Sequence, residues 1–293
     1  MKILLTGKNG QVGFELQKKI SALGEVIATD REELDLTDLD AIKNFIDQTK
    51  PDIIINPAAY TAVDKAESET DLAYLVNVTA PKILAEKAAE LDIPLIHFST
   101  DYVFDGLKNG AYVETDETNP QSVYGKTKCE GEEKVRAHHK HIILRTSWVF
   151  GVHGNNFLKT MLRLTQEKES LNIVADQWGS PASVSILSDV TFKVVDTIFK
   201  NKNFNEYGTY HVTSDGETNW FEYASFIAGE LIKLNTNIKC GPDQIRPILT
   251  SKSPTTAKRP LNSRLNCEKL KKTFVLELPH WESEVKKVLR EVI

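Results

Sequence analysis

The sequence predicts an α/β protein with a doubly wound parallel sheet and a smaller α/β lobe. Apolar runs without polar alternation are typical of strands that are buried on both faces, as in parallel sheets. Such runs occupy residues 3–6, 26–29, 53–56, 95–99 and 142–146. Stretches with helical spacing of apolar residues separate them, at 12–23, 39–48, 80–91 and 124–137. Strands that alternate with helices indicate βαβ units and hence a Rossmann-type sheet.

The alternation weakens beyond residue 150, where loops become more frequent. A predicted helix at 186–199 and a predicted strand at 209–213 return to the sheet. We therefore expect a Rossmann domain of residues 1–150 and about 185–214, and a substrate-binding lobe of about 151–184 and 215–293. Ligands of open α/β sheets bind at the carboxyl ends of the strands, so the substrate is expected in a cleft between the lobes.

Composition gives no sign of a nucleic-acid or membrane partner. The chain has 36 basic and 41 acidic residues, a net charge of −5 and no long block of one sign. No apolar run approaches the length of a membrane span, and the amino-terminal apolar run is too short for a signal peptide. Cys129, Cys240 and Cys267 are widely separated, which argues against disulfides and zinc. We expect a cytoplasmic protein without a metal ion.

Three glycines at the start of the chain predict a dinucleotide site. Gly7, Gly10 and Gly13 lie between the first predicted strand and the first predicted helix, and Gln11 and Val12 complete this turn. The first glycine permits a tight turn, the second lets the backbone approach a pyrophosphate, and the third lets the helix pack on the strand. A helix N-terminus also attracts anions. The alternative interpretation is a glycine turn that binds nothing.

Two neighbouring residues at the end of the second predicted strand point to different cofactors. Asp30 can accept a hydrogen bond from the ribose hydroxyl of NAD, whereas Arg31 can neutralise the 2′-phosphate of NADP. We favour NADP(H) because Arg31 is present, and NAD(H) stays open. Asp35 and Leu36, on the following loop, are expected beside the adenine.

Tyr124, Lys128 and Thr100 predict the reduction of a carbonyl group. Tyr124 and Lys128 are four residues apart in a predicted helix and therefore share one of its faces. A free phenol has a pKa of about 10, and a nearby ammonium group lowers that pKa, so that the tyrosine can exchange a proton near neutrality. Thr100 follows the strand at 95–99, and its hydroxyl can share the substrate oxygen with Tyr124. Tyr-x-x-x-Lys by itself is also frequent by chance.

Longer motifs add a resemblance to a known superfamily. The G-x-x-G-x-x-G spacing resembles that of the extended short-chain dehydrogenases/reductases. Ala58, Ala59 and Tyr60 resemble the alanine-rich loop of that superfamily, which passes beneath the nicotinamide half of the cofactor. Residues 99–106 read S-T-D-Y-V-F-D-G and resemble the S-T-D-Y-V-F-x-G signature of the dTDP-4-dehydrorhamnose reductases. Further stretches that agree with this family, in the same order, are 124–132, 145–151 and 259–265.

The resemblance implies a particular reaction. It is the NADPH-dependent reduction of the C4 keto group of dTDP-4-dehydro-L-rhamnose, the last step of dTDP-L-rhamnose synthesis for cell-surface polysaccharide. In this reaction Tyr124 would protonate the new oxygen, Thr100 would hold it, and Lys128 would anchor the cofactor and tune Tyr124.

The resemblance also implies substrate contacts. Asp101, Tyr102 and Trp148 match family positions that line the sugar pocket. Arg259 is the candidate for the diphosphate, because an arginine fork suits phosphate oxygens. A surface salt bridge is the alternative role for Arg259.

Related classes remain as alternatives. Sugar-nucleotide dehydratases carry Thr-Asp-Glu where this chain has Thr100-Asp101-Tyr102, which disfavours elimination of water. The sequence separates other sugar-nucleotide reductases and the epimerases from this family only through the family signatures. The regulatory subunit of methionine adenosyltransferase resembles the family without being a reductase, and the intact Thr100, Tyr124 and Lys128 set argues against that role.

The family also suggests a metal between subunits. Members can bind magnesium through glutamates, and Glu15 matches one such position. The segment after residues 179–181, where a second carboxylate is expected, reads A-S-V-S at 182–185. One carboxylate rarely holds magnesium against water, so we expect no structural magnesium. A homodimer is possible, and the sequence leaves the oligomeric state open.

Overall fold

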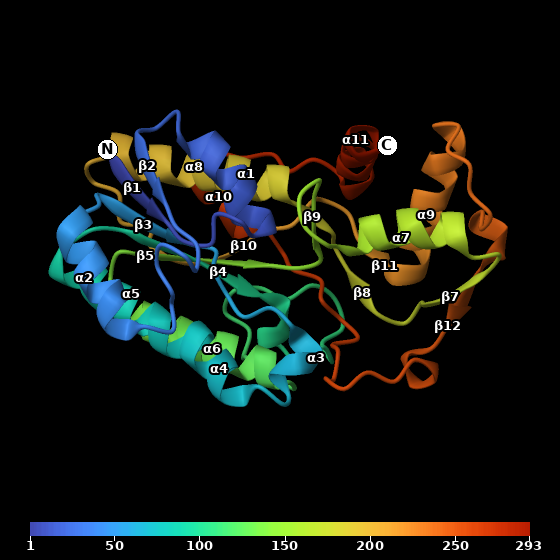
Figure 1. The fold of residues 1–293 in the computed structure, drawn as a ribbon, viewed down its shortest axis with the longest axis horizontal. Coiled ribbons are helices and arrows are strands. Elements are labelled where there is room, and N and C mark those ends of the chain that lie inside the picture. Colours follow the sequence, from blue (N-terminus) through green and yellow to red (C-terminus); the bar gives the residue numbers. More distant parts are fainter.

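The computed structural model describes residues 1–293, and a six-stranded parallel sheet forms its larger part (Figure 1). The strand order is β10-β5-β4-β3-β1-β2. Their bounds are β1 Lys2–Leu5, β2 Glu25–Ala28, β3 Ile53–Asn56, β4 Leu95–Thr100, β5 His141–Thr146 and β10 Gly208–His211. β3 and β4 are buried along their whole length, as apolar runs without alternation require. The predicted doubly wound α/β fold is confirmed.

Helices cover both faces of this sheet (Figure 1). One face carries α1 (Gln11–Ile20), α8 (Val184–Lys200) and α10 (Glu268–Phe274). The other face carries α2 (Leu39–Thr49), α5 (Ala80–Glu90) and α6 (Val123–Arg136). Shorter turns connect them, namely α3 (Val63–Ala66), α4 (Thr70–Tyr74), the π-helical η1 (Leu75–Thr79) and the 3₁₀ turn η2 (Asp101–Val103). No helix is both long and apolar enough to cross a membrane.

The smaller lobe has its own core beside the sheet (Figure 1). Its helices are α7 (Phe157–Glu167), α9 (Trp220–Lys233) and α11 (Trp281–Val292). Its strand pairs are β7 (Leu171–Val174) with β12 (Ile245–Ile248) and β8 (Trp178–Gly179) with β11 (Thr218–Asn219). The pair of β6 (Val149–Phe150) and β9 (Ala182–Ser183) lies between the two cores. Two 3₁₀ turns, η3 (Pro242–Gln244) and η4 (Thr250–Lys252), flank β12. Aromatic side chains dominate this core, since Tyr223 contacts Phe150, Phe157 and Trp281.

The carboxyl-terminal segment is divided between the two cores. Leu270 and Phe274 of α10 pack with the six-stranded sheet, whereas Val285 and Leu289 of α11 pack in the smaller lobe. The sequence-based boundary placed all of 215–293 in the smaller lobe, and the packing of α10 corrects it. We propose that the larger domain comprises residues 1–150, about 185–214 and the α10 segment.

Candidate active site

The glycine turn between β1 and α1 is built so that only glycine fits. Gly7 has a φ of +64°, and a Cβ on Gly13 would lie 2.0 Å from the Gly7 carbonyl oxygen. Gly10 precedes α1 and gives no side-chain cap to its first turn. The first N–H groups of α1 therefore stay available to an anion. Gln11 accepts a hydrogen bond from Asn156 of the smaller lobe (3.0 Å), and Val12 packs on the core.

A cavity of about 270 Å³ adjoins this turn. Eight of the residues that the sequence predicted for the cofactor line it: Gly7, Asp30, Arg31, Asp35, Leu36, Ala58, Ala59 and Tyr60. Asp30 accepts a hydrogen bond from the backbone N–H of Asn9 (2.9 Å) and so ties β2 to the glycine turn. The Arg31 side chain is 73% exposed, and its Nε donates to Asp35 over 3.1 Å. An exposed guanidinium at this rim can turn toward a phosphate.

Asn77 fixes the alanine-rich loop that forms the floor of this cavity. Its side chain accepts from the Tyr60 N–H (2.8 Å) and donates to the Tyr60 carbonyl (3.1 Å) and to Thr127 of α6 (3.1 Å). A Cβ on Gly131 would lie 2.0 Å from the Asn77 carbonyl, so the π-helical turn and α6 pack backbone to backbone. Sequence reasoning missed Asn77, because a single asparagine carries no motif.

The three predicted catalytic side chains meet at the end of β4. Thr100 is buried there, and its hydroxyl donates to Asp101 over 2.9 Å. Ser122 caps α6 by accepting from the Gly125 N–H, which places Tyr124 in the first turn of the helix. Thr100 lies near enough to the Tyr124 phenol to act on its pKa. The Tyr124 ring meets the Tyr102 ring edge to face, with a centroid distance of 5.4 Å.

The expected lowering of the Tyr124 pKa is wrong. Burial raises the pKa of Tyr124 above the usual range of a phenol, and the nearby Thr100 side chain only partly offsets this. Lys128 is not hydrogen-bonded to the phenol: its Nζ donates to the Phe98 carbonyl (2.6 Å) and lies 3.3 Å from Nε2 of His97. Burial lowers the pKa of Lys128 to about 8. The phenol therefore stays protonated at neutral pH and can give up a proton.

A second cavity, of about 310 Å³, contains three of the predicted substrate residues, Tyr102, Trp148 and Arg259. Trp148 has a φ of +50° and stacks on Trp220 with a centroid distance of 3.6 Å. Such a backbone conformation is costly, and this stack helps to hold it. Arg259 donates to the Tyr102 hydroxyl (3.2 Å) and to Asp64 of α3 (2.9 Å), so a carboxylate already occupies its fork.

Asp101 is a buried carboxyl group beside the catalytic hydroxyls. Burial raises its pKa to about 6, and the polar side chains of Ser263 and Thr100 act in the opposite direction. Its Oδ2 atom has no hydrogen-bond partner. A buried oxygen of this kind is able to receive a hydroxyl group of a bound molecule.

An ion pair behind the site links α6 to β5. Glu132, one turn after Lys128, accepts two hydrogen bonds from Arg145, of 2.8 and 2.7 Å, and both side chains are buried. Removal of either partner would leave a buried charge, which commonly costs about 3–5 kcal/mol. The pair fixes α6 against the sheet and hence the position of Tyr124. Motif reasoning did not identify it, because the pairing depends on the tertiary fold.

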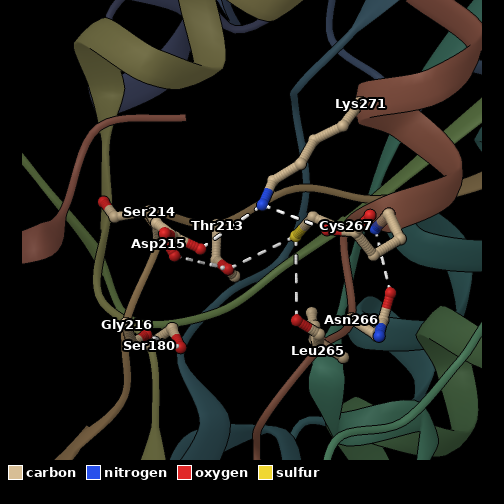
Figure 2. Close-up of polar contacts among 10 residues, drawn as sticks. Ser180, Thr213, Ser214, Asp215, Gly216, Leu265, Asn266, Cys267 and Lys271 are labelled. Atoms are coloured by element: carbon tan, nitrogen blue, oxygen red, sulfur yellow. Dashed lines mark hydrogen bonds and ion pairs between the residues drawn. The ribbon is translucent and has the colours of Figure 1, made fainter. Parts of the chain in front are cut away.

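Another cavity, of about 370 Å³, is lined by residues that follow β10, among them Thr213, Ser214 and Asp215 (Figure 2). Its charged groups pair among themselves: Lys271 with Asp215 (3.4 Å), and Arg264 with Glu217 (3.1 Å). Cys267 is buried in its wall, 3.5 Å from the Thr213 hydroxyl (Figure 2). The structure contains no cluster of three side chains able to hold a metal ion.

The parallel sheet, the glycine turn and the Thr100, Tyr124 and Lys128 set define a Rossmann protein of the short-chain dehydrogenase/reductase class. Solved structures of that class have the same fold at low identity. One is the UDP-glucose 4-epimerase of Thermus thermophilus in complex with NAD, with a TM-score of 0.78 and 17% identity. At this identity the likeness concerns the fold alone.

The chain belongs to a more specific family within this class, since the family model described as the RmlD substrate binding domain matches residues 1–293. It is 42% identical to the dTDP-4-dehydrorhamnose reductase of Escherichia coli K12, over 100% of this chain and 98% of the relative. A dTDP-4-dehydrorhamnose reductase structure from Clostridium acetobutylicum has a TM-score of 0.91 and 40% identity, covering 100% and 99% of the two chains. Another, from Bacillus anthracis in complex with NADP, has a TM-score of 0.89 and 35% identity, covering 99% of each.

Proposed function

We propose that this chain is a dTDP-4-dehydrorhamnose reductase, which reduces the C4 carbonyl of dTDP-4-dehydro-L-rhamnose to give dTDP-L-rhamnose, the last step in making this sugar donor for cell-surface polysaccharide. The observation that carries the proposal is the meeting of Thr100, Tyr124 and Lys128 at the end of β4. Full-length identity of about 40% to curated reductases of this name supports the substrate.

The residues around the glycine turn fit a dinucleotide. A Cβ on Gly7 would lie 3.0 Å from the Cβ of Ala58, so the turn and the alanine-rich loop leave space only for backbone at that point. The uncapped start of α1 supplies N–H donors for a pyrophosphate. Arg31 supports NADP(H), because its guanidinium has one partly exposed carboxylate partner, Asp35, and lies at the rim of the cavity. The NADP in the Bacillus anthracis relative agrees with this choice.

The protein's own groups supply the proton and the charge stabilisation. The bound reduced nicotinamide contributes the hydride. Tyr124 holds a proton on its phenol and gives it to the carbonyl oxygen as that oxygen gains charge. The Thr100 hydroxyl rotates away from Asp101 and donates a second hydrogen bond to the same oxygen. Loss of one such donor commonly raises the activation barrier by about 3 kcal/mol.

The second cavity supplies the substrate contacts of this proposal. The Trp148–Trp220 stack forms an apolar wall, and the open Oδ2 of Asp101 can accept from a sugar hydroxyl. Arg259 can hold the diphosphate if the phosphate oxygens replace Asp64 on its fork. A cytoplasmic location is part of the proposal, and three free, buried cysteines support it.

The direct test mixes the purified protein with NADPH and dTDP-4-dehydro-L-rhamnose. The proposal requires stoichiometric loss of nicotinamide absorbance and the appearance of dTDP-L-rhamnose in chromatography. Tight nucleotide binding without turnover would instead favour a regulatory protein like the methionine adenosyltransferase subunit. Conversion of the sugar without net loss of NADPH would favour an epimerase.

A further inference from the structure

A line of four buried polar side chains crosses the sheet and ends at the catalytic lysine. The Thr6 hydroxyl donates to Oδ1 of Asn56 (2.5 Å), and Nδ2 of Asn56 lies 3.0 Å from Nδ1 of His97. The other ring nitrogen of His97, Nε2, lies 3.3 Å from Nζ of Lys128. All four side chains are buried, with exposures of 2% or less.

The strand order places these side chains in sequence. Thr6 directly follows β1, Asn56 ends β3, and His97 lies within β4, and β1, β3 and β4 are neighbours in the sheet. Asn56 and His97 are register partners, so their side chains share one face of the sheet. Thr6 precedes Gly7 of the glycine turn. The line therefore runs from the proposed cofactor loop to Lys128.

When Lys128 is charged, hydrogen-bond chemistry allows this line one complete arrangement, and a neutral Lys128 admits a second one as well. A charged Lys128 has no acceptor, so Nε2 of His97 must accept from it, the ring proton lies on Nδ1, and Asn56 presents its oxygen to the ring. A neutral Lys128 can accept from Nε2–H, and then Nδ1 accepts from the Asn56 amide and Thr6 donates to Oδ1 of Asn56. In both arrangements Lys128 also donates to the Phe98 carbonyl. The heavy-atom positions in the structure match the second arrangement.

We propose that His97 is a positioning residue for Lys128. When Lys128 gains or loses a proton, the His97 ring changes its tautomer, and this change alters the hydrogen bonds of Asn56 and Thr6. This role rests on the proposed reductase function. The exchange releases one proton in all: Lys128 passes from ammonium to amine, the His97 ring proton passes from Nδ1 to Nε2, the ring stays neutral in both states, and one proton goes to solvent. The coupling holds the amine at β4 in both states and links it to the glycine turn.

Lys128 is the side chain of this line whose protonation state changes with pH. Burial, together with the charge of Lys128, lowers the pKa of His97 well below its usual value, so the ring stays neutral. The titratable groups that face Lys128 are the neutral His97 from β4 and the charged Glu132 from its own helix, and Arg145 of β5 is bound to Glu132. Near Tyr124 lies Asp101 of η2. Thr6 and Asn56 do not titrate.

The test is the location of the ring proton of His97, read from its two ¹⁵N chemical shifts across the titration of Lys128. We expect Nδ1–H below the pKa of Lys128, which is about 8, and Nε2–H above it. The Lys128→Met variant should abolish this change. A proton that stays on one nitrogen throughout, or a change that survives in Lys128→Met, would overturn the proposal.

Two other buried histidines are internal controls. Nδ1 of His211 lies 3.1 Å from the Tyr112 carbonyl, and Nε2 of His138 lies 2.8 Å from the Ile93 carbonyl. A carbonyl only accepts, so each ring must keep its proton on that nitrogen. Their tautomers should not change over the same titration. These measurements need no turnover, so they are independent of the substrate assignment.

The effect on catalysis is tested with His97→Leu and His97→Gln. A leucine side chain cannot form the hydrogen bonds of His97. A glutamine amide can both donate and accept, so it should keep most of these hydrogen bonds. We expect His97→Leu to shift the Lys128-dependent limb of the kcat pH profile by about one pH unit, because loss of a polar partner changes a pKa by about that amount. His97→Gln should shift this limb less. A wild-type profile in folded His97→Leu would contradict the role. If that variant does not fold, the tautomer measurement on the wild type decides.

Discussion

The Lys128 amine donates a 2.6 Å hydrogen bond to the Phe98 carbonyl oxygen. Phe98 lies two residues before Thr100 on β4, and Lys128 lies one helical turn after Tyr124 on α6. The bond therefore joins the strand and the helix that carry the two hydroxyls of the site. Because both bonded groups are buried, loss of the bond would leave an unsatisfied carbonyl, which commonly costs about 1–3 kcal/mol.

Arg31 is predicted to set the preference for NADPH. Replacement by alanine removes a charged donor at the cavity rim, and such a hydrogen bond contributes about 1.5–3 kcal/mol. We expect KM for NADPH to rise about 10–100-fold, with KM for NADH nearly unchanged. Arg163→Ala is the control, since that exposed side chain pairs with Glu167 on α7. Equal effects of Arg31→Ala on both cofactors would contradict the assignment.

Gly13→Ala should damage the dinucleotide site. The new Cβ would lie 2.0 Å from the Gly7 carbonyl oxygen, and backbone must move to admit it. Overpacking of this kind costs roughly 1–3 kcal/mol, so calorimetry should show NADPH binding at least about tenfold weaker. Gly229→Ala, in α9, is the control: the nearest atom to the new Cβ is Cγ of Pro242, 3.8 Å away, and binding should be unchanged. Unaltered NADPH affinity in Gly13→Ala would exclude the turn as the pyrophosphate site.

Asp101 is predicted to lower stability at neutral pH. Its folded-state pKa of about 6 exceeds the usual 3.8, so the native protein keeps a proton that the unfolded chain has released. Stability therefore falls as pH rises through this window, and the cost of about 3 kcal/mol persists above it. Asp101→Asn should raise the free energy of unfolding at pH 7 by up to this amount and should match wild type below the window.

Denaturant titrations of Asp101→Asn at several pH values check this expectation. Glu86→Gln, at a half-exposed carboxylate on α5, is the control and should change the free energy of unfolding by less than about 0.5 kcal/mol. A stability difference between Asp101→Asn and wild type that does not depend on pH would show that Asp101 is not held with a raised pKa.

Arg259 is predicted to bind the diphosphate through its planar fork. Arg259→Lys keeps the charge but loses the two-point geometry, so KM for the sugar nucleotide should rise roughly 10–100-fold with little change in kcat. Asp64→Asn removes the competing carboxylate charge and should leave that KM unchanged or lower it. Steady-state kinetics distinguish these outcomes, and a wild-type KM in Arg259→Lys would refute the contact.

Much of the fold and part of the site could be predicted from local pattern. The buried strands and the glycine turn follow from residue types at fixed spacing, and Tyr124 and Lys128 share a helix face because of their separation. The direction of the Lys128 amine could not be predicted, since it depends on the Phe98 carbonyl and on the His97 ring across the fold.

Other parts of the site depend on long-range contacts. Asp64 and Arg259 are separated by 195 positions, so no motif joins them. Asn77 and His97 are single polar residues in apolar surroundings, and only the packing shows what they hold. The placement of α10 on the sheet has the same origin, because its short amphipathic pattern suits either core.

The central claim is that the Tyr124 phenol protonates the carbonyl oxygen during reduction. Its most direct measurement is the single-turnover rate of NADPH oxidation by Tyr124→Phe at neutral pH, beside wild type and beside Tyr74→Phe, which alters an exposed ring. The account predicts a loss of about 100–10,000-fold in Tyr124→Phe, with NADPH binding intact and Tyr74→Phe at the wild-type rate. A Tyr124→Phe rate near that of wild type would contradict it.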